Sequence, residues 1–141
     1  MNEILHNQNW ELIEEIDIYA ENDIVKARQQ VRFHAKNLGM GIVDQTRVTT
    51  AASELFRNMF QYAEGGKVKI EYGLFNEKSA LIITCTDKGN GIDNLELALT
   101  DGYSSASGMG LGLPGAKRLV DDFLIDTRKG KGTCIRIVKW K

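Results

Sequence analysis

A glycine-rich run from Gly108 to Leu113 stands directly before a predicted helix start and has the composition of a phosphate-binding loop. The first turn of a helix presents unpaired amides and the positive end of the helix dipole to an anion. A phosphate cradle is therefore the chemistry that this run predicts. The pattern GxGxxG also occurs from Gly110 to Gly115, but no strand precedes it and no βαβ unit follows, so we expect no Rossmann site. The Walker pattern GxxxxGK[ST] does not occur.

A second polar loop, Asp-Lys-Gly-Asn-Gly at 87–91, follows the most apolar stretch of the chain. Open α/β sheets place their ligands at such strand ends. Asp87 offers a carboxylate that only accepts hydrogen bonds, while Gly89 and Gly91 allow a ring or a phosphate to approach the backbone closely. The same run also fits an ordinary turn, and on these residues alone that alternative stays open.

Glu54 and Asn58 stand four residues apart in a stretch with helical periodicity. They would project from one face of that helix, about one turn apart, at the edge of the apolar stripe that contains Leu55 and Met59. Taken alone, a solvated pair or an intrahelical hydrogen bond explains these two residues at least as well as a function does.

The elements that must position these groups follow from periodicity. Alternation predicts a first strand over 15–21, with Ile16 and Ile18 on its apolar side. Apolar residues at helical spacing predict a helix that is capped at 22 or 23 and ends at Gly39. They predict a second helix that is capped at Asp44 and ends before Gly65.

The second half of the chain contains four more predicted strands and one more full helix. The strands are expected over 67–74, 79–86, 123–128 and 133–140, with a short helix at 95–99, a mobile Gly/Ser loop at 101–112 and a helix at 111–120. This order lacks the strict βαβ alternation of a doubly wound sheet. We therefore expect an α+β fold, a two-layer α/β sandwich whose mixed, mostly antiparallel sheet is covered on one face by helices.

Length and composition are those of a globular protein. The chain has 141 residues, 43% hydrophobic and 26% charged, which predicts a single domain over 1–141 with residues 1–14 as a flexible extension. A net charge of −1 argues against nucleic acid as a partner. No apolar run approaches the ~20 residues of a membrane span, and the N-terminus lacks the features of a signal peptide, so we expect a cytoplasmic protein.

The metal-binding and redox residue types carry no signal of their own. Cys85 and Cys134 each lie in an apolar, strand-like run without metal-ligand spacing, so we expect buried, reduced thiols. His6 and His34 show no paired spacing, and we assign no metal to them.

The three candidate functional segments described above occur in a definite order along the chain. Glu-x-x-x-Asn lies on a helix, Asp-x-Gly-x-Gly follows a buried strand, and a Gly/Ser loop then opens onto a helix, with Gly132-Thr133 starting the last strand. This combination resembles the GHKL ATPases, the family of gyrase, MutL and the histidine kinases, which share the Bergerat fold. The resemblance covers nearly the whole chain.

The resemblance implies a role for each residue that matches the family pattern. Glu54 would polarise the attacking hydroxyl, and Asn58 would hold Mg²⁺ bridged to the phosphates of ATP. Asp87 would accept a hydrogen bond from the adenine amine, and Thr133 would reach the base side through water. Five glycines would shape the base pocket or wrap the phosphates: Gly89, Gly91, Gly108, Gly110 and Gly112.

Length and several short stretches indicate one branch of this family. The chain is too short for the transducer domains of gyrase-like members or for the helical hairpin of a sensor histidine kinase. The stretches at 43–47, 101–105 and 112–119 resemble the stand-alone serine kinases and anti-sigma factors, above all the stressosome switch kinases. That likeness implies phosphorylation of serine on a STAS-domain antagonist and, after release, activation of a PP2C-type phosphatase. Together these steps form a partner switch that controls a sigma factor in a stress response.

Two other interpretations stay open. The chain could be a nucleotide-gated binding module of the anti-sigma-factor kind, with little or no phosphotransfer, or a scaffold with a degenerate site. The sequence departs from the branch pattern at Asn90, where proline is common, and residues 1–10 have no counterpart in it.

Overall fold

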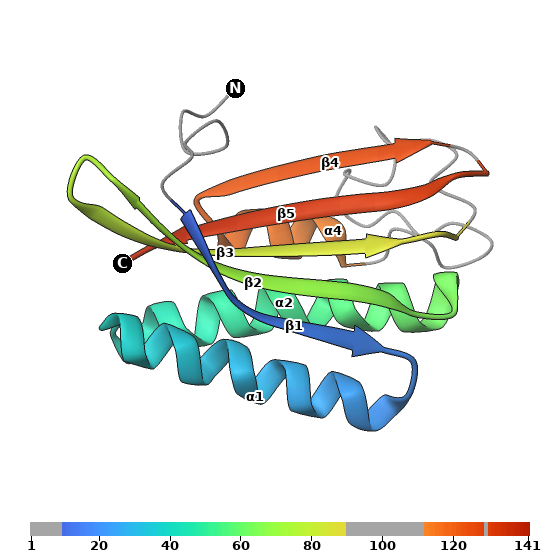
Figure 1. The fold of residues 1–141 in the computed structure, drawn as a ribbon, viewed down its shortest axis with the longest axis horizontal. Helices are drawn as coiled ribbons and strands as arrows, with labels where there is room; N and C mark the ends of the chain where they lie inside the picture. The colour runs from blue at the N-terminus through green and yellow to red at the C-terminus, as the bar shows by residue number, and fades with distance from the viewer. Residues whose placement is uncertain (1–9, 90–111, 129) are drawn as a thin grey trace.

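The protein, as a computed structural model, is described here over residues 10–89, 112–128 and 130–141. This part of the chain forms three helices and one five-stranded sheet with the strand order β1-β2-β3-β5-β4 (Figure 1). The elements in chain order are β1 (Trp10–Ile18), α1 (Glu21–Leu38), α2 (Ile42–Ala63), β2 (Gly66–Phe75), β3 (Lys78–Asp87), α4 (Leu113–Leu119), β4 (Asp122–Arg128) and β5 (Gly132–Trp140). The expected helix-covered α+β fold is confirmed. All four pairings of the described strands are antiparallel, so the sheet is antiparallel rather than mixed.

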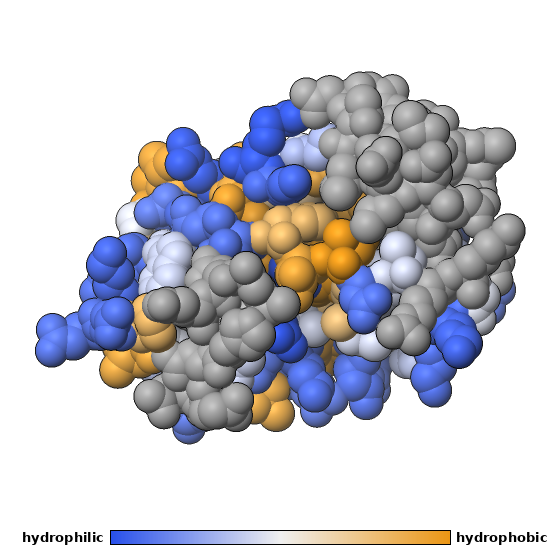
Figure 2. Space-filling view, turned by 90° about the horizontal axis from the view of Figure 1, so that it is seen from above, coloured by the Kyte–Doolittle hydropathy of each residue, from blue (hydrophilic) through white to orange (hydrophobic). Residues whose placement is uncertain are grey.

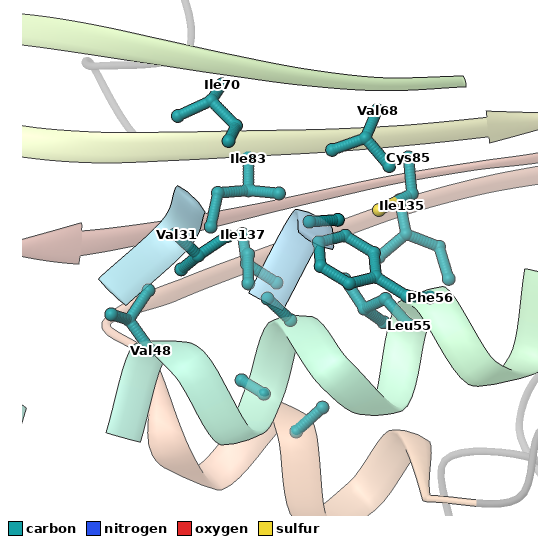
Figure 3. Packing of buried hydrophobic residues seen from close by; sticks show 14 of the residues in the cluster. Val31, Val48, Leu55, Phe56, Val68, Ile70, Ile83, Cys85, Ile135 and Ile137 are labelled. Carbon is teal, nitrogen blue, oxygen red and sulfur yellow. The ribbon is translucent and has the colours of Figure 1, made fainter. Parts of the chain in front are cut away.

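The main core lies between the sheet and helices α1 and α2 (Figure 3). Phe56 of α2 is fully buried beneath the central strands, where Ile83 of β3 and Ile137 of β5 are also 0% exposed. Strand β3 is a near-continuous apolar run, as expected of the buried centre of a sheet. Helix α2 is thereby fixed against the sheet, with its opposite side exposed to solvent.

Strand β1 begins five residues earlier than expected, because a β-bulge interrupts the side-chain alternation from which its start was predicted. Its register against β2 shifts between Leu12 and Glu14. Since side chains alternate along a strand, one extra residue moves all the following side chains to the other face. Trp10 consequently packs on the open face of the sheet, whereas Glu14 and Ile16 face α1. Residues 10–14, which we assigned to a flexible extension, are thus part of the sheet, and the strand ends at Ile18 rather than at 21.

Both long helices start earlier than predicted. Helix α1 has Ala20 as its N-cap, and the Asp23 carboxylate in its first turn accepts hydrogen bonds from the backbone N of Ala20 and of Tyr19, each at 3.0 Å. Helix α2 has Gly41 as its N-cap, so Asp44 lies within the first turn. The acidic residues that we expected as caps therefore lie inside the first turn, where a carboxylate still favours the helix N-terminus. The predicted stop at Gly39 is confirmed, with φ at 97°.

Three smaller expectations differ from the structure. Leu74, the apolar last residue of the strand expected over 67–74, is 44% exposed near the end of β2. Cys134 is only partly buried, because it lies on the open face of β5, while Cys85 is buried as predicted; both are free thiols. Helix α4 starts at Leu113 rather than 111. The expected helix at 95–99 and the loop at 101–111 lie outside the described residues.

The β4 side of the molecule is less buried than the centre of the sheet. Figure 2 shows this side, with apolar side chains in a central area bordered by hydrophilic ones. Residues of α4 and β4 that pack against the core from here are only partly buried, among them Leu119, Val120, Phe123 and Ile125. Among residues 10–89, 112–128 and 130–141, no helix combines the length and the apolar character needed to cross a membrane.

Candidate active site

Asp87 is the last residue of β3, where that strand meets the start of β5. Its Oδ1 accepts hydrogen bonds from the backbone N of Gly89 at 2.9 Å and from that of Thr133 at 3.3 Å. Burial raises the pKa of Asp87, and the two backbone hydrogen bonds oppose that rise. Within the described part of the chain no donor reaches Oδ2, so this oxygen can accept from a ligand.

Two glycines let the backbone close around Asp87. A Cβ at Gly89 would lie 2.7 Å from the Cβ of Ala63, so the loop after β3 packs directly on the end of α2. Gly132 has a φ of 103°, and a Cβ there would overlap the carbonyl of Asp87 and lie 2.9 Å from the Cα of Lys88. Only glycine fits this close approach. We did not place Gly132 among the site residues, although its position directly before Thr133 was a signal for it.

Thr133 is buried on β5, opposite Asp87 in the register of the two strands. Its Oγ1 lies 2.9 Å from the Oγ1 of Thr127 on β4, so the two hydroxyls share a hydrogen bond. Thr127 is a second residue that sequence reasoning missed, because only the pairing of β4 with β5 brings it there. Asp87, Gly89 and Thr133 therefore form one polar corner at the end of the central strands.

Glu54 and Gly112 meet although they are far apart in the chain. Gly112 precedes α4 with a φ of 85°, and a Cβ at this residue would overlap Oε2 of the Glu54 carboxylate and lie 3.2 Å from its Cδ. The backbone that leads into α4 thus touches the glutamate on α2. Two of the three sequence elements, the helical glutamate and the glycine-rich loop, are brought together here.

Arg57 holds the other oxygen of the same carboxylate. Its Nη1 lies 2.7 Å from Oε1 of Glu54, three residues earlier on α2. The glutamate is thereby bracketed, with a guanidinium on Oε1 and the Gly112 backbone on Oε2. The i,i+3 spacing of Glu54 and Arg57 could have identified this pair from the sequence.

Helix α2 connects the two groups of residues. Ala63 touches Gly89 near one end of the site, and Glu54 touches Gly112 at the other. Nine residues of helix separate them, or about 14 Å at 1.5 Å per residue. Asn58 lies between them on α2, one turn after Glu54 and partly buried. One face of α2 therefore connects the acceptor at Asp87 with the Glu54 carboxylate and the backbone that leads into α4.

Three glycines of the predicted site, Gly91, Gly108 and Gly110, lie outside the described residues. In the part of the chain that is described, no three or more His, Cys, Asp or Glu side chains gather into a group that could hold a metal ion. The Nε2 of His34 lies 2.9 Å from Oε1 of Glu14.

Comparison with known proteins connects this geometry to a family. Residues 43–141 match the family model described as histidine kinase-, DNA gyrase B-, and HSP90-like ATPase. The matched range contains Glu54, Asn58, Asp87 and Thr133, together with the glycines of the predicted site and Gly132.

Several curated proteins are similar over most of their length. Serine/threonine-protein kinase RsbT of Bacillus subtilis is 46% identical over 125 residues, which cover 89% of this chain and 94% of that protein. The anti-sigma F factor of Clostridium beijerinckii is 32% identical over 120 residues, 80% of this chain and 82% of the relative. The anti-sigma F factor of Clostridium kluyveri is 29% identical over 113 residues, 76% and 78% of the two chains.

Proposed function

This chain belongs to the family of histidine kinase-, DNA gyrase B- and HSP90-like ATPases and is a serine/threonine protein kinase, and from this premise we propose that it phosphorylates a STAS-domain antagonist on serine. The observation that carries the proposal is the contact of Glu54 with Gly112. It brings a carboxylate that can take a proton next to the backbone that would wrap the phosphates of ATP. A phosphoryl acceptor and donor could therefore meet at this point.

The polar corner at Asp87 supports adenine as the base. The exocyclic group of adenine is a donor, whereas guanine carries an acceptor at the same place. An ionised carboxylate only accepts, and Oδ2 of Asp87 is the oxygen left for a ligand. Thr133 would reach the base side through water, and Gly89 with Gly91 would leave room for the ring.

The opposite end of the site supports phosphoryl transfer. Backbone amides at Gly108, Gly110 and Gly112 would bind the phosphates, since phosphoryl transfer requires mainly positioning and neutralisation of charge. The serine oxygen attacks the γ-phosphorus while the Glu54 carboxylate accepts its proton. The bond from the γ-phosphorus to the β–γ bridging oxygen breaks, and ADP leaves with the electron pair.

The residues present fit Mg²⁺ as the accompanying ion. Mg²⁺ binds oxygen, keeps several waters and usually takes one or two protein ligands beside the substrate phosphates. The amide oxygen of Asn58, on α2 between the two ends of the site, would be such a ligand, and the described residues contain no acidic cluster to replace it. Mg²⁺ would supply neutralisation of charge on the phosphates, and Asn58 would be the residue of α2 that holds it.

The partners that we propose follow from the branch of the family. Serine/threonine-protein kinase RsbT is the relative of highest identity reported above, and the anti-sigma F factors are regulators of a sigma factor by name. We infer a partner switch in the cytoplasm: the chain phosphorylates its STAS-domain antagonist within a stressosome, is released, and then activates a PP2C-type phosphatase in a stress response.

The test is phosphorylation of purified STAS-domain proteins from the same organism. Each would be incubated with the chain and Mg-ATP, and mass spectrometry would detect and place the phosphoryl group. We expect one of them to gain phosphoserine. Glu54→Gln should lower the rate by about a hundredfold or more without changing the Kd for Mg-ADP. Glu21→Gln, an exposed glutamate at the start of α1, is the matched control. An absence of phosphoserine from every protein of the panel would contradict the proposal.

A nucleotide-gated binding module is the second candidate, and the anti-sigma F relatives favour it. In that case Mg-ATP would change the retention of a partner on a column without any phosphoryl transfer. Glu54→Gln would then bind the partner as the wild type does. Equal partner retention with phosphoserine formation only in the wild type would instead support the kinase.

A further inference from the structure

One exposed stripe of α2 runs from the start of the helix to the candidate catalytic glutamate. Its members recur three or four residues apart, so they lie on one face of the helix. The face opposite to this stripe is buried against the sheet, with Val48, Leu55 and Phe56 at 2% exposure or less. The stripe consists of Ile42, Val43, Thr46, Arg47, Thr50, Glu54 and Arg57.

The first turn of this stripe is apolar. Ile42 is 70% exposed and Val43 is 60% exposed, so two large apolar side chains adjoin each other in solvent. Single exposed apolar residues are ordinary, but an adjacent pair at this exposure is typical of a contact site. Neither side chain packs on the core of the described structure, and Val48 at the next inward position does that instead.

The surroundings of this apolar pair are cationic. Arg47 follows Val43 by one helical turn, and the Lys141 side chain lies over Gly39 in the turn that leads into α2. No carboxylate in the described part of the chain pairs with Arg47 or Lys141. The nearby Asp44 and Asp121 instead bind Nζ of Lys139, at 3.4 Å and 3.0 Å. An acidic group on a partner would therefore complement this corner.

The position of the stripe relative to Glu54 indicates what the partner is. Eleven residues separate Val43 from Glu54, or about 16–17 Å along one helix face. In the proposed function ATP would bind on the other side of Glu54, where Gly112 lies. The stretch 43–47, one of those that resemble the stand-alone serine kinases, is outside the proposed nucleotide site but supplies three exposed side chains of the stripe.

We propose that Ile42, Val43, Thr46, Arg47 and Thr50 form the docking surface for the protein substrate of the kinase. The substrate face that binds here carries an apolar side chain beside a carboxylate, and it directs a serine along α2 toward Glu54. This inference rests on the proposed function, because it presupposes that Glu54 serves a protein acceptor.

The test compares the KM of the phosphorylated STAS-domain protein for Val43→Glu and Arg47→Glu. A glutamate at 43 lies in the first turn of α2, where a negative charge is favourable, so the helix should remain intact. We expect each variant to raise the KM for the protein substrate about tenfold or more, as truncation of a contact worth about 1.4 kcal/mol would. The kcat at saturation and the Kd for Mg-ADP should not change.

Matched controls and contrary outcomes separate this inference from the proposed function. Leu124→Glu on β4 and Lys78→Glu on β3 alter an exposed apolar and an exposed basic residue away from α2, and should leave the KM unchanged.

An unchanged KM for Arg47→Glu would overturn the docking surface but not the proposed kinase activity. This holds even if Val43→Glu fails to fold. A dimer that sediments as such and dissociates in Val43→Glu, with no change in KM, would assign the stripe to a second copy and overturn the proposal. Failure of the wild type to phosphorylate any STAS-domain protein would refute the proposed function, and the docking surface with it.

Discussion

At the scale of single residues, the site depends on two places where a glycine allows a close contact of the backbone. Gly112 contacts the Glu54 carboxylate, and Gly132 contacts the backbone of Asp87, each with a positive φ. A side chain at either position would separate two segments that the proposed reaction needs in contact. Gly115 lies inside α4, and a Cβ added there would have no atom of the described residues within 4 Å. This glycine therefore makes no such close contact.

We predict opposite effects on stability for alanine at Gly112 and for alanine at Gly115. Gly112→Ala should lower the free energy of unfolding by about 1–3 kcal/mol, because it forces strain at positive φ and overlap with Glu54. It should also weaken Mg-ADP binding. Gly115→Ala should raise stability by up to about 1 kcal/mol, since alanine favours the helix. Urea denaturation and ADP titration of both variants would check this, and equal stability of the two would contradict it.

At the scale of elements, the bulge in β1 determines which side chains meet α1. Because of the extra residue, Glu14 points toward the helix, where its Oε1 accepts from Nε2 of Gln30 at 2.8 Å and lies 2.9 Å from Nε2 of His34. On the other face Trp10 lies under the guanidinium of Arg136, 4.9 Å from the ring centroid. One edge strand is thus anchored on both faces of the sheet.

The Glu14 anchor should make stability depend on pH. Burial alone would raise the pKa of Glu14, but the hydrogen bonds with His34 and Gln30 and the charges of His34 and Lys26 outweigh it and lower the pKa below 4.5. A carboxylate with a lowered pKa stabilises the fold above its unfolded value, and this contribution is lost as the pH falls through the folded value. At neutral pH the wild type should therefore be more stable than Glu14→Gln.

The difference between the two proteins should shrink when the pH falls below 4.5, the ordinary value for this group. Denaturation curves of both proteins at neutral and at acidic pH would measure it. Glu11→Gln, an exposed glutamate of the same strand, serves as the control and should show no such convergence. A constant difference between wild type and Glu14→Gln at all pH values would contradict the role of the ionised Glu14 carboxylate.

The helices and strands with a regular apolar pattern could be predicted from the sequence. The apolar runs of β3 and β5 and the helical spacing of α1 and α2 identified these elements, because each buries one continuous face. Strand β1 was placed too late since the bulge interrupts the alternation between Leu12 and Glu14. The open-face position of Cys134 was also missed, because an apolar run does not tell which face of a strand is covered.

The candidate site was predictable where its chemistry is local in the sequence. Asp87 with Gly89, and Glu54 with Asn58, stand close together in the chain. Thr127 and Arg57 were missed for different reasons: Thr127 enters only through strand pairing, and Arg57 has the spacing of an ordinary helical ion pair. The sequence contains no direct signal for contacts between segments as distant as Gly112 and Glu54.

At the scale of the whole molecule, the proposed role of Asp87 would couple the stability of the fold to the binding of nucleotide. Burial raises the pKa of its carboxyl group above the ordinary 3.8, against the two backbone hydrogen bonds. A group with a raised pKa favours the fold when protonated and disfavours it at a pH above its folded value. The ionised carboxylate that would select adenine therefore reduces stability at neutral pH.

We predict that Asp87→Asn raises the Tm of the protein without nucleotide at neutral pH, and that this gain disappears below pH 3.8, where the wild-type carboxyl group is also neutral. The amide Oδ1 can still accept from Gly89 and Thr133, but Nδ2 would then oppose the adenine amine, donor against donor. With Mg-ADP at about a hundred times its Kd, the wild type should gain about 2.7 kcal/mol, or roughly 5–15 °C in Tm. The variant should gain almost nothing. Thermal unfolding with and without Mg-ADP measures both effects, and an equal rise in Tm for the two proteins would remove Asp87 from the base pocket.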